Sequence, residues 1–329
     1  MKQQQFEMTY QPLWDEITAL MDDLGRKRRE RNLDIEQHLR FPALYRELCS
    51  HYALARSRGF SPARVEQLHA LVMRGHPLLY RVSGAWRWRV LHFIFAGFPR
   101  ALRRQARYFW VALAAFLLPA LLSGLGTYYS EDLVYSLMSR ATVAQMEESY
   151  DPANARPGVS RERSSDTDFM MFGYYIQNNI GIGFRTFALG LLYGVGSLFL
   201  LLYNGLVIGG VAGHLSRLEY YDTFWPFVSG HGAFELTAIV ICGAAGLMLG
   251  HALIAPGQMS RVQALKQRAH EALPLVMGAA LMLLVAAFIE AFWSSSDLPP
   301  ATKYSVAGLL WTLVILYLSF SGRGDRGTR

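Results

Sequence analysis

The chain has 329 residues, of which 52% are hydrophobic, 13% are aromatic and only 17% are charged. Charged residues make up roughly a quarter of an ordinary soluble domain, so this composition excludes that class and predicts an all-α, polytopic membrane protein. The formal charge of +7 could indicate nucleic-acid binding, but the basic residues gather in residues 1–107 and beside apolar stretches. That placement favours orientation in a lipid bilayer and no nucleic-acid partner.

Residues 1–85 are hydrophilic and predict a small helical domain on the cytoplasmic side. Residues 1–107 contain 19 Lys plus Arg against 10 Asp plus Glu. Apolar residues recur at helical spacing in this region, as in Leu13, Ile17, Leu20, Leu24, Val65, Leu68, Leu71 and Val72. Helix breaks are predicted at Gly25, Phe41-Pro42, Ser61-Pro62 and Gly75-His76-Pro77. The pattern therefore predicts three or four helices, and it lacks the apolar core of a cleavable signal peptide.

Aromatic and arginine residues alternate through residues 86–107. Aromatic bodies with arginine head groups are typical of a helix that lies at the headgroup level of an anionic leaflet. We therefore predict an interfacial helix for this segment. The alternative is a buried helix of the N-terminal domain.

Six apolar stretches follow and define a membrane domain over residues 108–322. They are Tyr108–Tyr128, Ile180–Tyr203, the short Gly205–Leu218, Trp225–Ile254, Leu273–Trp293 and Tyr304–Phe320. The segment 129–179 has eight acidic and four basic residues, which predicts an extracytoplasmic loop. Six crossings place the basic N-terminal region, the basic residues after the fourth stretch and the tail 323–329 together in the cytoplasm. A re-entrant course for residues 205–218 stays open.

Ionisable residues inside the predicted membrane segments are candidates for function. A charge at the centre of a membrane helix costs about 3 kcal/mol even on insertion scales. His231 and Glu235 are four residues apart and share one helix face. Arg185 is the predicted counter-charge of Glu235, with a proton or ion path and a metal site as alternatives. The metal interpretation is the weakest, because His-x-x-x-Glu lacks the second histidine of a zincin motif, and we assign no metal.

Asparagines stand at the predicted ends of the second span. The amides of Asn178, Asn179 and Asn204 could cap helix ends, which is the more common use, or line a polar cleft. Glu290 and His214 fall near predicted span ends, where snorkelling or a loop position is expected. The predicted partner-binding region or intramembrane polar core thus consists of Asn178, Asn179, Arg185, Asn204, His231 and Glu235.

Glycines recur at four-residue spacing along the apolar segments. Small residues at this spacing allow membrane helices to approach closely. The predicted packing positions are Gly190, Gly194, Gly205, Gly209, Gly213, Gly246 and Gly250. Such faces suit packing within one chain and equally a homo-oligomer.

Four segments carry a resemblance to a known family. They are Asn178-Asn179, the stretch from Phe187 to Gly196, Asn204-Gly205 and, above all, His231-Gly232-Ala233-Phe234-Glu235. Over roughly residues 108–320 the chain resembles the stage II sporulation protein M family. The resemblance implies an integral protein of the bacterial inner membrane. Sporulation members of that family anchor two peptidoglycan-remodelling proteins, and for relatives with a long basic N-terminal region it implies an envelope partner or a MoxR-type ATPase.

Enzyme motifs are missing from the sequence. It contains no Ser-His-Asp set, P-loop, Rossmann fingerprint or kinase motif. We therefore expect a non-enzymatic protein without a cofactor, which serves as a scaffold or anchor for cell-envelope or ATPase partners. The alternative is a channel or transporter with Arg185, His231 and Glu235 along its pathway, and both termini are expected in the cytoplasm.

Overall fold

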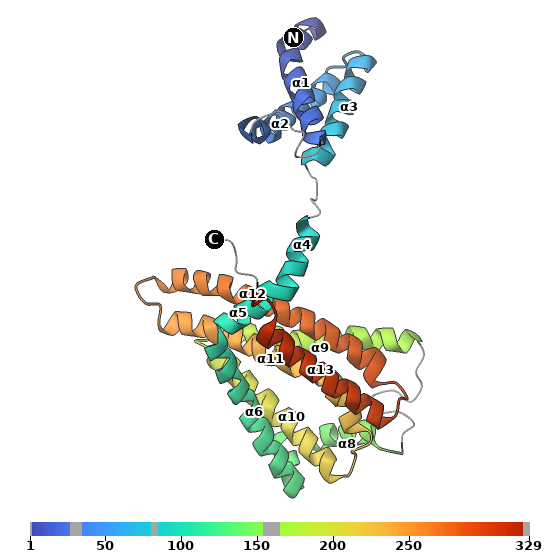
Figure 1. The fold of residues 1–329 in the computed structure, drawn as a ribbon, viewed down its shortest axis with the longest axis vertical. Helices are drawn as coiled ribbons and strands as arrows, with labels where there is room; N and C mark the ends of the chain where they lie inside the picture. The colour runs from blue at the N-terminus through green and yellow to red at the C-terminus, as the bar shows by residue number, and fades with distance from the viewer. Residues whose placement is uncertain (1, 27–34, 80–84, 154–164, 325–329) are drawn as a thin grey trace. The chain divides into compact units, whose positions relative to one another are not determined.

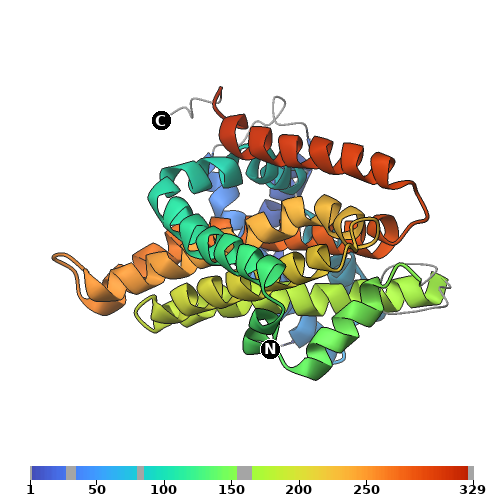
Figure 2. The same ribbon diagram turned by 90° about the horizontal axis from the view of Figure 1, so that it is seen from below.

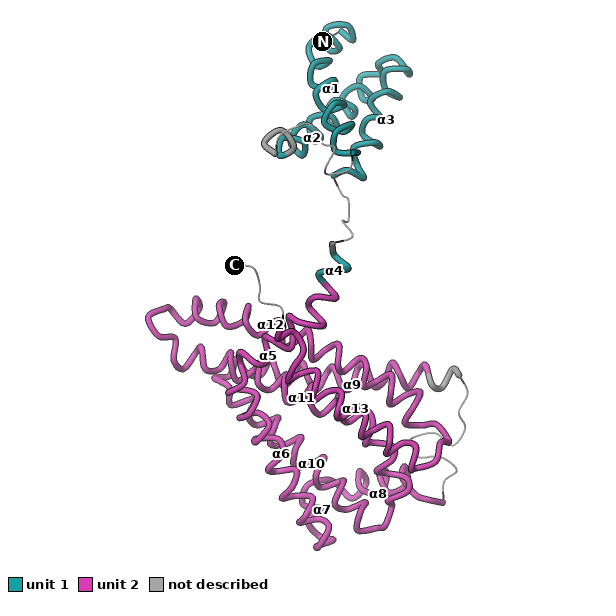
Figure 3. Tube along the Cα trace, in the orientation of Figure 1, with its two compact units in different colours: residues 1–89 teal, residues 90–329 magenta. Residues whose placement is uncertain are grey.

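The protein folds into two compact units, Met1–Arg89 and Val90–Arg329 (Figures 1 and 3). The structure is a computed structural model that describes residues 2–26, 35–79, 85–153 and 165–324. Within these ranges every regular element is a helix. The predicted all-α, polytopic class is therefore confirmed.

Unit 1 consists of three long helices, α1 (Gln3–Gly25), α2 (Ile35–Ser57) and α3 (Pro62–Leu79). They enclose a hydrophobic core of their own. Its buried members are Phe6, Trp14, Ile17, Leu20, Met21, Phe41, Leu44, Tyr45, Leu48, Ala55 and Leu68. The apolar spacing in the sequence thus corresponds to one continuous core.

Two of the predicted helix breaks in unit 1 are confirmed and two are wrong. Helices end at Gly25 and begin after Ser61, whereas α2 continues through Pro42 and α3 through Pro77. Packing between α2 and α3 explains why these two helices continue through Pro42 and Pro77. The Tyr45 hydroxyl donates a hydrogen bond of 3.0 Å to the Val72 carbonyl, and its ring packs against Gly75 so closely that a Cβ there would lie 2.7 Å away. Tertiary contact here overrides local propensity.

Unit 2, called the membrane unit below, forms a bundle of long helices with short connecting ones, and α4 straddles the boundary between the two units. The elements are α4 (Ala85–His92), η2 (Phe93–Gly97), α5 (Phe98–Arg104), α6 (Ala106–Tyr129), α7 (Asp132–Leu137), α8 (Arg140–Tyr150), α9 (Ser165–Ala188), η3 (Leu189–Leu191), α10 (Val195–Arg217), α11 (Phe224–Ile254), α12 (Arg261–Phe288), η4 (Ile289–Ser294) and α13 (Pro300–Phe320). Helices α11 and α12 run side by side in both views (Figures 1 and 2).

Five helices of the described residues are long and apolar enough to cross a membrane. They are α6, α10, α11, the continuous α12–η4 segment and α13. The predicted spans Tyr108–Tyr128, Trp225–Ile254 and Tyr304–Phe320 match α6, α11 and α13, and the predicted span Leu273–Trp293 lies inside a longer helix. The more polar α9 is not one of these five and packs beside α11 and α12.

The predicted division between the second and third spans is wrong. The chain turns at Leu189–Gly194 rather than beside Asn204, so α9 begins within the predicted loop 129–179 and α10 is one full-length helix. Tyr193 and Gly194 both have positive φ at this turn, 53° and 80°. Only glycine adopts that conformation without a Cβ clash, and the apolar residues on both sides hide the turn from a hydropathy argument.

The segment 86–107 is not one continuous helix. A π-helical stretch separates α4 from α5, and Gln105 breaks the chain before α6. Helix α5 packs into the membrane unit rather than only along its surface, because Phe98 and Leu102 are buried there. Arg103 donates hydrogen bonds of 2.7 Å and 2.6 Å to the carbonyls of Leu318 and Ser321, which end α13. Cationic side chains commonly satisfy helix C-termini in this way.

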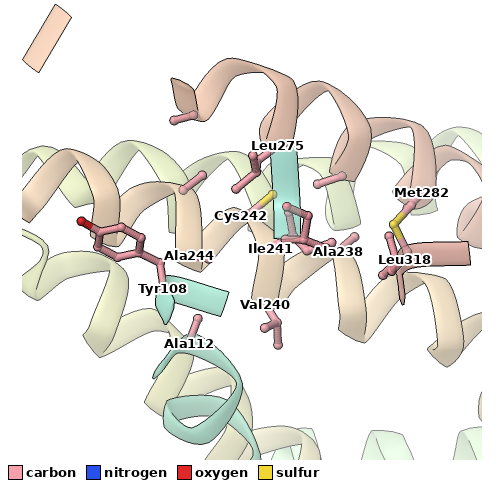
Figure 4. Packing of buried hydrophobic residues seen from close by; sticks show 14 of the residues in the cluster. Tyr108, Ala112, Ala238, Val240, Ile241, Cys242, Ala244, Leu275, Met282 and Leu318 are labelled. Carbon is pink, nitrogen blue, oxygen red and sulfur yellow. The ribbon is translucent and has the colours of Figure 1, made fainter. Parts of the chain in front are cut away.

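Contacts between α6 and α10 are made backbone to backbone. Added Cβ atoms at Gly205, Gly209 and Gly213 would lie closer than 3.0 Å to the carbonyl oxygens of Phe116, Ala120 and Gly124, respectively. Both series advance by four residues, so the two helices run parallel with matching ridges. Gly190 and Gly250 meet the backbone of Gly246 and Gly194 in the same manner at the start of α10. Larger apolar residues fill the remaining core around α11 (Figure 4).

Candidate functional site

The membrane unit has two chemically different ends. At one end Tyr108 contacts His251, with 2.6 Å between the hydroxyl and Nδ1, and Gln105 donates to Glu271 at 3.2 Å. The start of α6, the first half of α12 and the end of α11 therefore lie together there. At the other end Glu147 lies 2.7 Å from His214 Nε2. The acidic segment after α6 thus packs on the end of α10.

A polar cluster lies inside the bundle towards the second end. His231 and Glu235 come from successive turns of α11, and the distance from His231 Nε2 to a Glu235 carboxylate oxygen is 3.9 Å. Glu290 of η4 joins them, so that one ligand atom from each of the three residues lies within 4.8 Å of the other two. At 1.5 Å rise per residue, His231 is about 10 Å and Glu235 about 16 Å beyond the start of α11. The three residues could hold a metal ion.

Neighbouring polar groups orient this cluster. His231 Nδ1 lies 3.0 Å from the hydroxyl of Ser294, which is fully buried. Asn179 Nδ2 donates to a Glu290 carboxylate oxygen at 3.3 Å, and Asn178 donates to Asn179 at 3.0 Å. The amide chain therefore connects α9 to the carboxylate of η4. Such fixed hydrogen bonds define both the ring orientation of a histidine and the position of a carboxylate.

The end of α8 closes the cluster with aromatic rings. Tyr150 stacks edge-on against Phe227, with 5.8 Å between centroids, and Phe227 stacks in the same way against His231 at 5.6 Å. Burial raises the pKa of the Tyr150 phenol well above its usual value, and the carboxylates of Glu290 and Glu235 add to the shift. Tyr150 is thus a neutral hydroxyl close to both acids at neutral pH.

Lys303 of α13 contacts the end of η4. Its ammonium donates a hydrogen bond of 2.7 Å to the Ser294 carbonyl, and its side chain is buried. Residues of α8, α9, α11, η4 and α13 therefore all lie around one site.

Comparison with known protein families gives a match over the region that contains this cluster. The profile of the family described as stage II sporulation protein M matches residues 109–295. The chain belongs to the stage II sporulation protein M family. A domain of unknown function, DUF8413, matches residues 4–81 in unit 1. Neither the curated proteins nor the solved structures contain a significant match.

The stage II sporulation protein M match includes His231, Glu235, Glu290 and Asn179 but not Lys303. Four of the five helices around the site thus lie within the shared region. Unit 1 lies outside that match and carries its own.

The structure does not bring Arg185 to Glu235. The Arg185 Nε donates instead to the Gly181 carbonyl one turn earlier, at 3.0 Å. Together with Asn178 and Gln177 it lines a separate cavity of ≈ 480 Å³ on α9. The predicted pairing of Arg185 with Glu235 is therefore wrong, because residue 185 lies near the end of α9 whereas the cluster contacts its middle.

The asparagines do not cap helix ends. Asn178 and Asn179 lie within α9, and Asn204 lies within α10, where its amide donates to the Leu200 carbonyl at 2.7 Å. The Asn204 amide thus hydrogen-bonds within its own helix, whereas the Asn179 amide donates to Glu290 in the polar cluster. The capping prediction failed because the helix boundaries were placed at the wrong residues.

Glu290 is a member of the site that the sequence did not predict. Its position near the end of an apolar stretch suggested snorkelling, whereas η4 extends the helix to Ser294 and turns Glu290 inward. Ser294 four residues later was the available signal, because it shares a helix face with Glu290. His214 was missed similarly: it is buried, and Glu147 supplies its partner.

Proposed function

We propose that this protein is a non-enzymatic scaffold of the bacterial inner membrane that anchors cell-envelope, peptidoglycan-remodelling proteins or a MoxR-type ATPase. The observation that carries the proposal is the separate unit 1. Its three helices bury a core of their own, so it does not depend on the apolar bundle for its packing. A compact hydrophilic unit tethered to a membrane bundle is the arrangement that an anchor requires.

The charge distribution supports an orientation for this scaffold. The basic residues of α5, the start of α12 and the end of α13 share one end of the membrane unit, through the contacts of Gln105 with Glu271 and of Arg103 with Ser321. Positive charge favours the cytoplasmic side. We infer that unit 1 and the C-terminus are cytoplasmic, and that α7 and α8 face the envelope, where a peptidoglycan-remodelling partner would dock.

The test is partner recovery from the native membrane. The full chain and a variant lacking residues 1–79 are extracted into nanodiscs without crosslinker, and co-purifying proteins are quantified by mass spectrometry. We expect the full chain to carry a stoichiometric envelope protein or ATPase, and the deletion to lose a cytoplasmic partner while its membrane unit keeps its thermal unfolding. A full chain that purifies without any stoichiometric partner contradicts the proposal.

The channel or transporter alternative has a discriminating variant in Glu235→Gln. A scaffold with this substitution retains its partners, since Glu235 faces into the bundle beside His231. If solute or ion flux in proteoliposomes is present and disappears in Glu235→Gln while partner recovery is unchanged, the function lies in transport rather than anchoring. Glu147→Gln is the matched control, because Glu147 is also a histidine partner but lies at the end of the bundle.

A further inference from the structure

We propose that His231, Glu235 and Glu290 form a binding site for one divalent first-row transition metal ion, of which Zn²⁺ is the test case. The site goes beyond the proposed anchoring function, because it concerns how the membrane unit is held together. The juxtaposition of three ligand atoms within 4.8 Å, from two separate elements of the chain, is the starting observation.

The donor set suits a transition metal. A neutral imidazole nitrogen with two carboxylate oxygens is a ligand combination that zinc, iron and manganese accept, whereas calcium requires six to eight oxygen ligands. Imidazole adds a preference for zinc or iron over magnesium. Three protein ligands leave one tetrahedral position for water or for a group from a partner.

The distances are compatible with closure around an ion. Ligand atoms at about 2.1 Å from a tetrahedral centre lie about 3.4 Å apart. His231 Nε2 and the Glu235 oxygen are 3.9 Å apart, which is too long for a hydrogen bond and close to the ligand spacing. Rotation of the flexible glutamate side chains would bring all three atoms to bonding distance without a backbone shift.

The surrounding hydrogen bonds resemble those of a built metal site. Metal-binding histidines commonly engage their second ring nitrogen with a fixed polar group, and ligating carboxylates are themselves hydrogen-bonded. Ser294 holds His231 Nδ1, which leaves Nε2 directed at the carboxylates. Asn179 donates to Glu290. One ligand from α11 and one from η4 are therefore both oriented by a residue outside the trio.

Neutralisation of the two carboxylates would favour binding of a divalent cation. Two carboxylates inside a membrane helix bundle, of which Glu235 is about 16 Å from the start of α11, repel each other in a low-dielectric medium. Lys303 beside η4 carries a single positive charge and can balance one carboxylate at most. A divalent cation bound directly to both carboxylates offsets their full charge. Proton uptake by the carboxylates is the competing solution, and the experiment distinguishes the two.

The ion would join α11 to the end of α12. His231 and Glu235 belong to α11, and Glu290 belongs to η4, whose neighbours include α9 through Asn179. The side chain of Glu235 is 17% exposed, so the trio is not fully enclosed by the bundle. We infer that the bound ion would link α11 to η4 and so stabilise the helix bundle.

The experiment measures bound zinc on the full chain in nanodiscs. The protein is stripped with a chelator, exchanged against Zn²⁺, washed and analysed by elemental mass spectrometry. We expect about one zinc per wild-type chain and at least a tenfold loss of affinity in Glu290→Gln and in His231→Asn. Ser294→Ala, which keeps all three ligands, should weaken binding about 10–100-fold as an orienting residue. Zn²⁺ should raise the melting temperature of the wild type but not of Glu290→Gln.

The matched control is Glu147→Gln, which breaks the histidine–carboxylate pair with His214 where no third ligand lies close among the described residues. It should keep full zinc occupancy. Wild-type protein without stoichiometric zinc, manganese or iron overturns the proposal and leaves protons as the neutralising species. Equal occupancy in wild type and Glu290→Gln, or equal losses in Glu290→Gln and Glu147→Gln, also overturns it.

Discussion

Substitution of Gly209 by alanine tests the close contact between α6 and α10. An added Cβ at this position would lie less than 3.0 Å from the Ala120 carbonyl oxygen, whereas ordinary contact begins at 3.4 Å. A backbone oxygen cannot rotate away, so the helices must separate by at least several tenths of an ångström. A gap of 0.5–1 Å already forfeits about a quarter to a half of the dispersion energy between facing atoms.

The expected magnitude follows from two opposing effects. Overpacking a fitted interface costs about 1–3 kcal/mol, and we place this position at the upper end because the clash is with backbone. Alanine is about 1 kcal/mol better than glycine within a helix, which offsets part of that loss. The net result is about 2 kcal/mol of destabilisation, or about 4–8 °C in melting temperature for a unit of this size.

Thermal unfolding in nanodiscs, followed by tryptophan fluorescence, measures the change. Gly308→Ala is the matched control, since Gly308 lies in an apolar helix with no atom within 4 Å of an added Cβ. It should leave the melting temperature unchanged or raise it slightly. A Gly209→Ala protein at least as stable as wild type, or an equal loss in Gly308→Ala, would refute the argument from close packing.

Three further predictions concern other contacts. Thr127→Val removes the 2.9 Å hydrogen bond from α6 to the Gly210 carbonyl and should cost about 0.6 kcal/mol in the same unfolding assay, the average for interhelical bonds in membranes. Burial lowers the pKa of His51 below its usual 6.5, and Glu47 opposes the shift. The contribution of neutral His51 to the stability of unit 1 is therefore present above pH 6.5 and is lost as pH falls through the lowered pKa. Denaturant unfolding from pH 7.5 to 5 should show this loss of unfolding free energy in wild type but not in His51→Phe. Arg103→Gln removes the charged donor from the end of α13, and hydrogen exchange should accelerate at residues 318–322 but not at the α11 core.

The class of fold was predictable because it depends on composition and the length of apolar runs. The spans that correspond to α6, α11 and α13 have strong hydropathy and clear polar flanks, so their positions were predicted within a few residues. Helix α9 was mispredicted for the opposite reason. It carries polar residues and begins in an acidic segment, so hydropathy assigned its first half to a loop. Its end is determined by a left-handed turn at Gly194 that no hydropathy window reveals.

The candidate site was predictable only where its residues are neighbours on one helix. His231 and Glu235 share a face by spacing alone, and the structure places them together. Glu290 is 55 positions beyond Glu235 in the printed numbering, and only the packing of α11 against α12 and η4 brings it to them. Arg185 is a basic residue inside a predicted span, but its side chain hydrogen-bonds within its own helix, to the Gly181 carbonyl. Long-range pairing thus required knowledge of the fold.

The position of α9 connects the glycine packing to the polar cluster. At one end its connection to α10 is held against α11 by close approach of Gly190 to Gly246 and of Gly194 to Gly250. Near the middle of α9, Asn179 donates a hydrogen bond to Glu290. Apolar packing adds to these two attachments, since Tyr175 of α9 shares a buried cluster with Ala287 and Ala291. Weakening the acidic cluster should therefore loosen α9 first and leave the α6–α10 pair intact. Hydrogen exchange in Asn179→Leu, with protection lost along α9 and kept at α10, provides the measurement that separates this local effect from global unfolding.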